Sequence, residues 1–140
     1  MDELAELRQK IEHQDYQSAL QIIDELEEMS KEDKLNKISS YLVILILHLI
    51  KEKAENRTSK SWSRSIDNSV YRINKVNKRR KSGGYYASKA DLVELIGEAY
   101  PQALKEAAYE AFEGEYKAEY LAKMVDEQQI QLTALEYLDC

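Results

Sequence analysis

Residues 59–65, Ser-Lys-Ser-Trp-Ser-Arg-Ser, bring together side chains that could hold a ligand. Serines at a helix start accept hydrogen bonds from backbone N–H groups that have no partner within the helix. Those N–H groups, with Arg57, Lys60 and Arg64 around them, have the chemistry to bind a phosphate or a carboxylate. The alternative is a capped helix start in which Trp62 is a core residue. Under either interpretation, Ser61 and Trp62 open a helix.

His48 lies inside the longest apolar run of the chain, residues 41–50. It is either a buried base or ligand, or a core imidazole that hydrogen-bonds to a neighbour. The absence of a second His or Cys nearby in the sequence favours the core imidazole. An enzyme site here would require His48, Arg57 and Trp62 to converge in one concave pocket.

The residue types that carry metal and redox chemistry are scarce. The chain has two His and one Cys, without H-E-x-x-H or C-x-x-C spacing. It also lacks a glycine-rich phosphate loop and a G-x-S-x-G elbow. We therefore expect no metal site, no cofactor and no catalytic residue, and we favour a protein that is not an enzyme.

Charge is distributed unevenly along the chain. Residues 51–81 carry a net charge of +8, between acidic segments of −6 (residues 1–50) and −8 (residues 82–140). The basic segment, 57–81, is either a phosphate-binding face or the partner of the chain's own acidic helices. If it binds nucleic acid, the candidate contacts besides Arg64 are Lys60, Arg72, Lys75, Lys78, Arg79, Arg80 and Lys81.

Helical spacing of apolar residues accounts for most of the sequence, and only four Gly and one Pro interrupt it. We predict an all-α fold, an up-and-down bundle of five to seven helices with residues 41–50 at its centre. The chain is expected to form a single domain, 1–140, with 115–140 as a helical extension. Expected helices cover residues 2–12, 15–29, 31–55 (capped by Ser30), 61–80, 89–100 (capped by Ser88) and 101–113.

The turn at 56–61 is short, as in antiparallel neighbours of a bundle. It should return the next helix beside the end of the preceding one. We therefore predict that Trp62 is largely buried against the 48–51 segment.

Location is suggested by three features. The chain begins with an acidic segment, its longest apolar run has ten residues where a spanning helix needs about 20, and its one cysteine has no partner. We expect a cytoplasmic protein without a membrane segment.

A family resemblance rests on an apolar helix that ends His-Leu-Ile-Lys, followed by Arg-Thr-Ser-Lys-Ser-Trp-Ser-Arg-Ser-Ile. These residues resemble the signature of domain-of-unknown-function family 29, small helical proteins that are abundant in photosynthetic bacteria. The resemblance covers residues 15–112. Glu52 stands where the family has Trp, and the family's Gln-Pro pair is absent. The motif residues, whose role the resemblance leaves open, are His48, Lys51, Arg57, Ser61, Trp62 and Arg64.

The missing catalytic motifs, the ten tyrosines and the many apolar helix faces favour a protein-interaction or regulatory module, which self-associates or docks on another protein. The alternative is a nucleic-acid-binding protein that uses the basic 57–81 segment.

Overall fold

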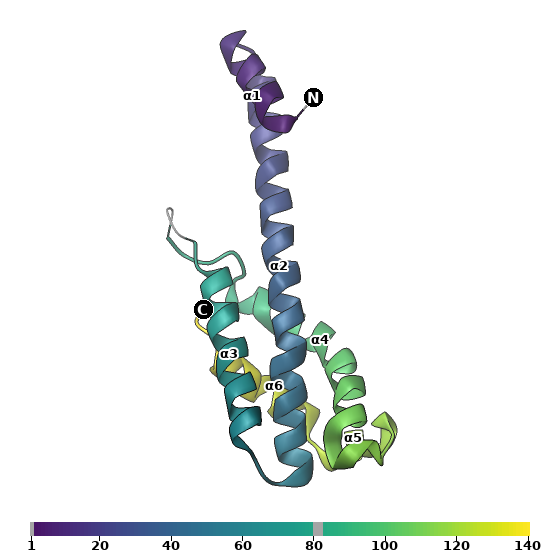
Figure 1. Ribbon diagram of the computed structural model, residues 1–140. Coiled ribbons are helices and arrows are strands. Elements are labelled where there is room, and N and C mark those ends of the chain that lie inside the picture. Colours follow the sequence, from purple (N-terminus) through teal and green to yellow (C-terminus); the bar gives the residue numbers. More distant parts are fainter. Residues whose placement is uncertain (1, 80–82) are drawn as a thin grey trace. The chain divides into compact units, whose positions relative to one another are not determined.

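The computed structural model describes residues 2–79 and 83–140, which form six α-helices and one short 3-10 helix, η1 (Figure 1). An all-α helical bundle of five to seven helices is thus confirmed. The helices are α1 (Glu3–Glu12), α2 (Tyr16–Glu55), α3 (Lys60–Asn77), α4 (Lys89–Glu110), η1 (Ala111–Gly114), α5 (Ala118–Met124) and α6 (Glu127–Glu136). None of the helices in the described ranges is long and apolar enough to cross a membrane.

The chain divides into two compact units, Met1–Lys34 and Leu35–Cys140. In the first unit, Asp2 caps α1 and Asp15 accepts a hydrogen bond from the N–H of Ser18 in the first turn of α2. Hydrogen bonds from the side chain and backbone of Ser18 hold the pKa of the Asp15 carboxyl below its usual value. The capping role predicted for Asp15 is therefore present.

The predicted helix boundary at Ser30 is wrong, because α2 runs without interruption over 40 residues. No Gly or Pro occurs between Tyr16 and Glu55. A serine in a helix interior costs only a fraction of a kcal/mol, roughly 0.5, so a cap-like serine does not stop a helix.

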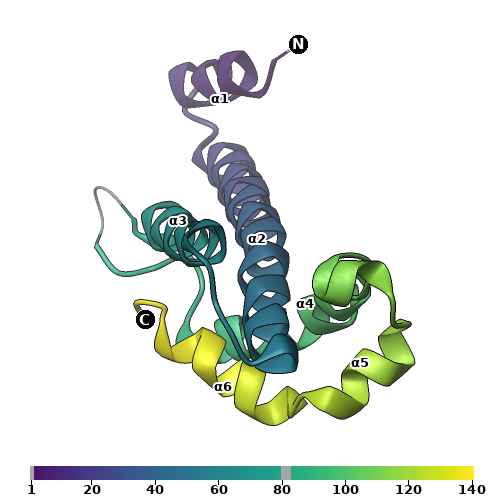
Figure 2. The same cartoon turned by 60° about the horizontal axis from the view of Figure 1, so that its bottom comes forward.

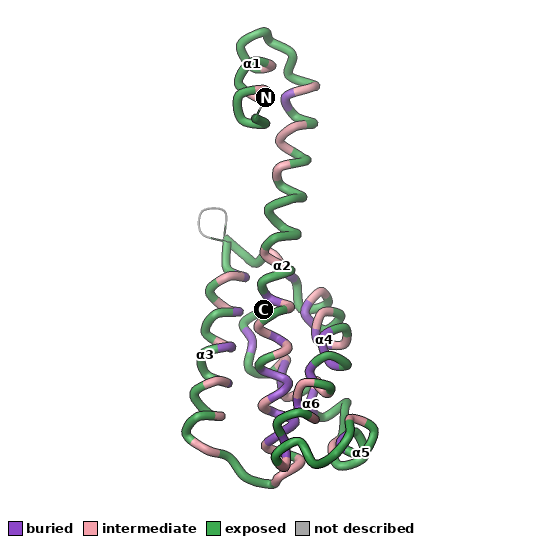
Figure 3. Tube along the Cα trace, turned by 45° about the vertical axis from the view of Figure 1, so that its right-hand side comes forward, coloured by how far each residue is buried: buried purple, intermediate pink, exposed green. Residues whose placement is uncertain are grey.

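The core of the second unit surrounds the apolar part of α2, as predicted from its sequence. Leu42, Leu45, Ile46 and Ile50 are fully buried there (Figure 3). The burial does not extend around the whole circumference, since Ile44 remains 38% exposed. One side of this segment therefore faces away from the core.

Two helices flank this part of α2, with α3 on one side and α4 on the other (Figures 1 and 2). The start of α4 has the predicted capping box, in which Ser88 and Asp91 exchange side-chain-to-backbone hydrogen bonds. Pro101 is predicted from the sequence to start or kink a helix; it does not start one, because α4 is one helix with this proline inside it. Proline removes one hydrogen bond from a helix interior, and the packing of the rest of α4 against the core outweighs this loss.

Residues 115–140 are helical, as expected, and contribute to the core. Helix α6 buries Ile130 and Ala134, and Leu138 follows at the same spacing of four. The N–H of Asp139 donates to the Asn74 side chain of α3 at 3.0 Å. The tail is therefore part of the second unit rather than an appendage.

The end of α3 and the segment that leads to α4 are joined by Asn77, which is almost fully buried. Its side-chain oxygen accepts from the N–H of Ala87 at 2.7 Å, and its side-chain nitrogen donates to the Ala87 carbonyl at 3.3 Å. One asparagine thus replaces a pair of strand-like backbone hydrogen bonds.

Candidate functional site: the pole of the bundle and the outer face of α3

Most of the motif residues lie where α2 ends and α3 begins. We call this end of the molecule, which also contains the end of α4, the pole of the bundle. Asn56 takes a left-handed conformation (φ 51°), and the N–H of Arg57 donates to the Glu52 carbonyl at 3.2 Å. This bond, which reaches five residues back, is the 6→1 bond of the Schellman pattern that ends a helix and reverses the chain. It brings Arg57 and the start of α3 back beside the last turn of α2.

The serine that caps α3 is Ser59. Its hydroxyl accepts from the N–H of Trp62 at 3.1 Å, and the helix begins at Lys60. Ser61 is exposed in the first turn. Only one serine of the motif therefore caps the helix, and the predicted start at Ser61 is one residue late.

Trp62 is adjacent to two cations. The Lys51 Nζ atom lies 4.6 Å from its ring centroid and the Arg57 Cζ atom lies 4.4 Å from it, both within cation–π distance. The predicted position of Trp62 next to Lys51 is correct. The prediction that it is largely buried agrees with its intermediate exposure, in which most but not all of the side chain is covered. It stands at the first turn of α3, where these two cations lie against its ring.

Lys51 is buried to 5% exposure at the end of α2. Its Nζ atom donates to Glu110 Oε1 at 3.1 Å, so that the ends of α2 and α4 are linked by charge. A buried ammonium requires such a partner, since its desolvation is otherwise uncompensated.

Glu55 provides a second link across the same pole. One of its oxygens accepts from Arg57 Nε at 3.1 Å, and the other accepts from the N–H of Phe112 at 3.2 Å. Phe112 and Glu113 are both left-handed, with φ of 50° and 58°. Two such non-glycine residues in succession cost roughly 1–3 kcal/mol each, and Glu55 helps to hold this turn in place.

His48 and Arg64 do not join this cluster. The His48 Nδ1–H donates to the Ile44 carbonyl one turn earlier in α2 at 2.8 Å. Arg64 is exposed on the outer side of α3. Arg57 and Trp62 are in contact, whereas no hydrogen bond or ring contact among the described residues joins His48 to either of them. The described residues also contain no group of three or more His, Cys, Asp or Glu side chains placed to hold a metal ion.

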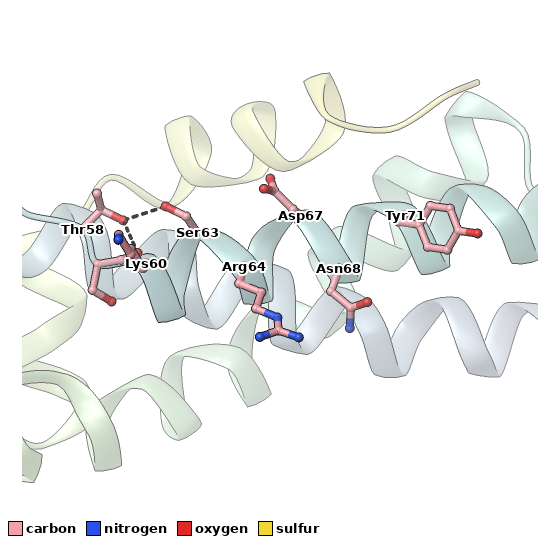
Figure 4. A pocket seen from close by; sticks show the side chains of 8 residues that line it. Thr58, Lys60, Ser63, Arg64, Asp67, Asn68 and Tyr71 are labelled. Atoms are coloured by element: carbon pink, nitrogen blue, oxygen red, sulfur yellow. Dashed lines mark hydrogen bonds between the residues drawn. The ribbon is translucent and has the colours of Figure 1, made fainter.

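The outer face of α3 forms a second candidate surface. Lys60, Arg64, Tyr71 and Lys75 follow one another at spacings of four, seven and four, which places them on one side of the helix. Figure 4 shows part of this side, where a shallow hollow of about 730 Å³ is lined by Thr58, Ser59, Lys60, Ser63, Arg64, Asp67, Asn68 and Tyr71.

The remaining basic residues of the segment are distributed around this face. Arg72, Lys78 and Arg79 are exposed, and the Arg79 Cζ atom lies 5.5 Å from the ring of Tyr86. Arg80 and Lys81 lie outside the described residues. The described cations of α3 and of the segment that follows it form no salt bridge, whereas Arg57, at the start of the basic segment, pairs with Glu55 of α2.

Comparison with protein-family models identifies the family of this chain. The family model for the domain of unknown function DUF29 matches residues 3–135. The chain belongs to this family. The match reaches beyond residues 15–112, so the expectation that the DUF29 resemblance stops before the tail is wrong. No curated protein and no solved structure matches the chain.

Within this DUF29 chain, the motif connects the end of α2, the start of α3 and the end of α4. Part of that role could not be predicted from the sequence. The sequence did not predict the contacts made by Glu55, Glu110 and the Phe112 N–H. Lys51 and Glu110, and likewise Glu55 and Phe112, are almost 60 residues apart, and no sequence pattern connects them. Glu52, at the family's Trp position, accepts a hydrogen bond from the Thr58 hydroxyl. A carboxylate therefore supports the turn at this position.

Proposed function

We propose that this chain is a non-enzymatic protein-interaction module whose first 34 residues are the docking element. The proposal rests on the small number of side chains that this unit buries. Of its described residues, 2–34, Ala19 alone is fully buried. Large apolar side chains that remain exposed there are Leu4, Ile11, Tyr16, Leu20 and Met29.

Such a helical pair gains little from its own packing. Units below about 40 residues usually need a disulfide, a metal or association to be stable. Exposed apolar residues on amphipathic helices are typical of surfaces that bind a partner. The first 34 residues contain eleven acidic and four basic side chains, a net charge of −7, so the complementary partner is basic.

The chain itself offers a basic partner surface, the outer face of α3. Its cations are exposed and form no salt bridge in the described structure, and Tyr71 adds an aromatic contact that is 60% exposed. We therefore propose self-association, with the acidic unit of one copy against α3 of another. Such a contact generates a symmetric dimer where two copies exchange it reciprocally, and rings or chains where it runs head to tail.

Sedimentation velocity over a range of protein concentrations tests this proposal. The expected result is a concentration-dependent species larger than a monomer, which weakens as salt rises because the contact is charge-complementary. Leu20→Gln should shift the equilibrium towards monomer, whereas Leu132→Gln in α6, at similar exposure (50% against 59%), should not. A strict monomer at low salt and high concentration would exclude self-association.

Nucleic-acid binding by the same face of α3 is the second candidate function. The observation in its favour is the row of unpaired cations with Tyr71 among them, since phosphates bind to cations and bases stack on exposed aromatic rings. Filter binding of labelled single-stranded DNA and RNA at low salt tests it. Retention that falls steeply with salt and is lost in Arg64→Gln/Lys75→Gln supports this function, and no retention at low salt eliminates it.

A further inference from the structure

A cleft of about 470 Å³ opens at the pole of the bundle, between the end of α2, the turn after it and α6. Figure 2 shows α6 passing beside this end of α2. The floor of the cleft is apolar, because Leu49 and Ile130 are buried to 5% and 2% exposure. Its volume falls within the roughly 300–1,000 Å³ of small-molecule sites. The other lining residues are Glu52, Lys53, Asn56, Arg57, Thr58, Thr133 and Tyr137.

The rim of the cleft carries two cations and one carboxylate. Arg57 is already oriented, since its Nε donates to Glu55 and its guanidinium lies over Trp62. The hydrogen bonds of the described residues use only this one of its five N–H donors, which leaves both terminal nitrogens for a ligand. A guanidinium held in this way loses little entropy when it binds a two-oxygen anion.

The carboxylate on the rim, Glu52, already has one hydrogen-bond donor. Glu52 accepts a hydrogen bond from the Thr58 hydroxyl, which disperses its charge. Among the residues that line the cleft, the two cations Lys53 and Arg57 outnumber this one carboxylate, while Glu55, which pairs with Arg57, is not part of the lining. Tyr137, which is 44% exposed, contributes an aromatic wall and a hydroxyl group.

We propose that this cleft binds a small organic anion, in which a carboxylate or phosphate group is attached to an apolar or aromatic body. The anionic group binds Arg57 and Lys53, and the body lies on Leu49 and Ile130 beside the ring of Tyr137. The motif residues Arg57 and Trp62 then have a second role, in which Trp62 holds the guanidinium towards the ligand. None of the cleft residues belongs to the first 34, so self-association is not required.

Titration of the ¹⁵N-labelled full chain with phenyl phosphate, benzoate and inorganic phosphate tests the proposal by NMR. The expected result is saturable shifts of amides in residues 49–58 and 130–137 with phenyl phosphate or benzoate, and weaker binding of inorganic phosphate, which lacks the apolar body. The comparison of the two organic probes distinguishes a phosphate site from a carboxylate site. Absence of saturable shifts, or shifts along α3 instead, would overturn the proposal.

Substitutions then check the contacts. The fluorescence of Trp62, the only tryptophan, provides the dissociation constant because Arg57 lies over its ring. Lys53→Gln, which does not touch Trp62 in the described contacts, should weaken binding roughly three- to fivefold, the effect of one partly exposed ion pair. Lys89→Gln, outside both candidate surfaces, should leave the constant unchanged. Equal binding by Lys53→Gln and the wild type would contradict the proposed site.

Discussion

Lys51 and Glu110, which are 59 residues apart, form an ion pair in which the lysine side chain is 6% exposed and the glutamate 47%. The two partners are therefore unequal. Removing the glutamate leaves a buried ammonium without its counter-charge, whereas removing the lysine leaves a carboxylate that water can solvate.

Glu110→Ala should consequently destabilise the protein more than Lys51→Met. We expect Glu110→Ala to lower the free energy of unfolding by about 1–2 kcal/mol, less than for a fully buried pair because water reaches Glu110. Lys51→Met should cost less, since methionine keeps much of the buried length without the charge. Urea denaturation of both variants measures the difference, and the reverse order of stability would contradict this account.

Trp62→Ala is expected to lower the free energy of unfolding by about 2–4 kcal/mol. This is slightly less than the roughly 3–5 kcal/mol for a fully buried Trp, because part of the ring remains exposed. The loss combines apolar burial with two cation–π contacts. Arg64→Ala and Lys78→Ala, at exposed positions, should remain within about 0.5 kcal/mol of the wild type. Thermal unfolding compares the three. A Trp62→Ala protein that keeps its melting temperature but loses a ligand would show that the ring is a binding residue alone.

Asn77→Ala should cost about 2–3 kcal/mol, because it leaves the N–H and carbonyl of buried Ala87 without their partners. Asn74→Ala is the matched control: it removes one bond, to the exposed Asp139 N–H, and should cost about 1 kcal/mol or less. Chemical denaturation measures both. Equal losses would mean that the link between α3 and the start of α4 is not a major source of stability.

Ionisation of Tyr100 should lower the free energy of unfolding at alkaline pH. Burial, with the nearby charges of Glu127 and Asp126, raises its pKa from 10.0 to about 12. Between these values the unfolded chain loses the phenol proton while the folded chain retains it, so stability falls as pH rises through this window. The loss is roughly 2 kcal/mol, and it should be absent in Tyr100→Phe. Denaturation of both proteins at pH 9 and above pH 11 tests this, and parallel pH curves would refute it.

Much of the secondary structure was determined by signals that lie within a few residues of one another. The Ser88–Asp91 capping box, the Asp15 cap and the apolar face of α3 are local, because a cap or a helical face involves only neighbouring turns. Family membership also follows from the sequence, because the DUF29 family model matches residues 3–135. The same local signals misled at Ser30 and Pro101, where the helix continues despite a cap-like or helix-breaking residue.

The partners of the motif residues were decided by the tertiary structure. No spacing rule connects Lys51 to Glu110 or Glu55 to the Phe112 N–H, since each pair meets only when the end of α4 packs beside the end of α2. The exposure of Trp62 depended in the same way on what lies next to the first turn of α3. Residue type and spacing determine which helices form and which face is apolar. Which charges meet at the pole of the bundle depends on how those helices pack, because contacts between residues nearly 60 positions apart are set by the whole core rather than by any local segment.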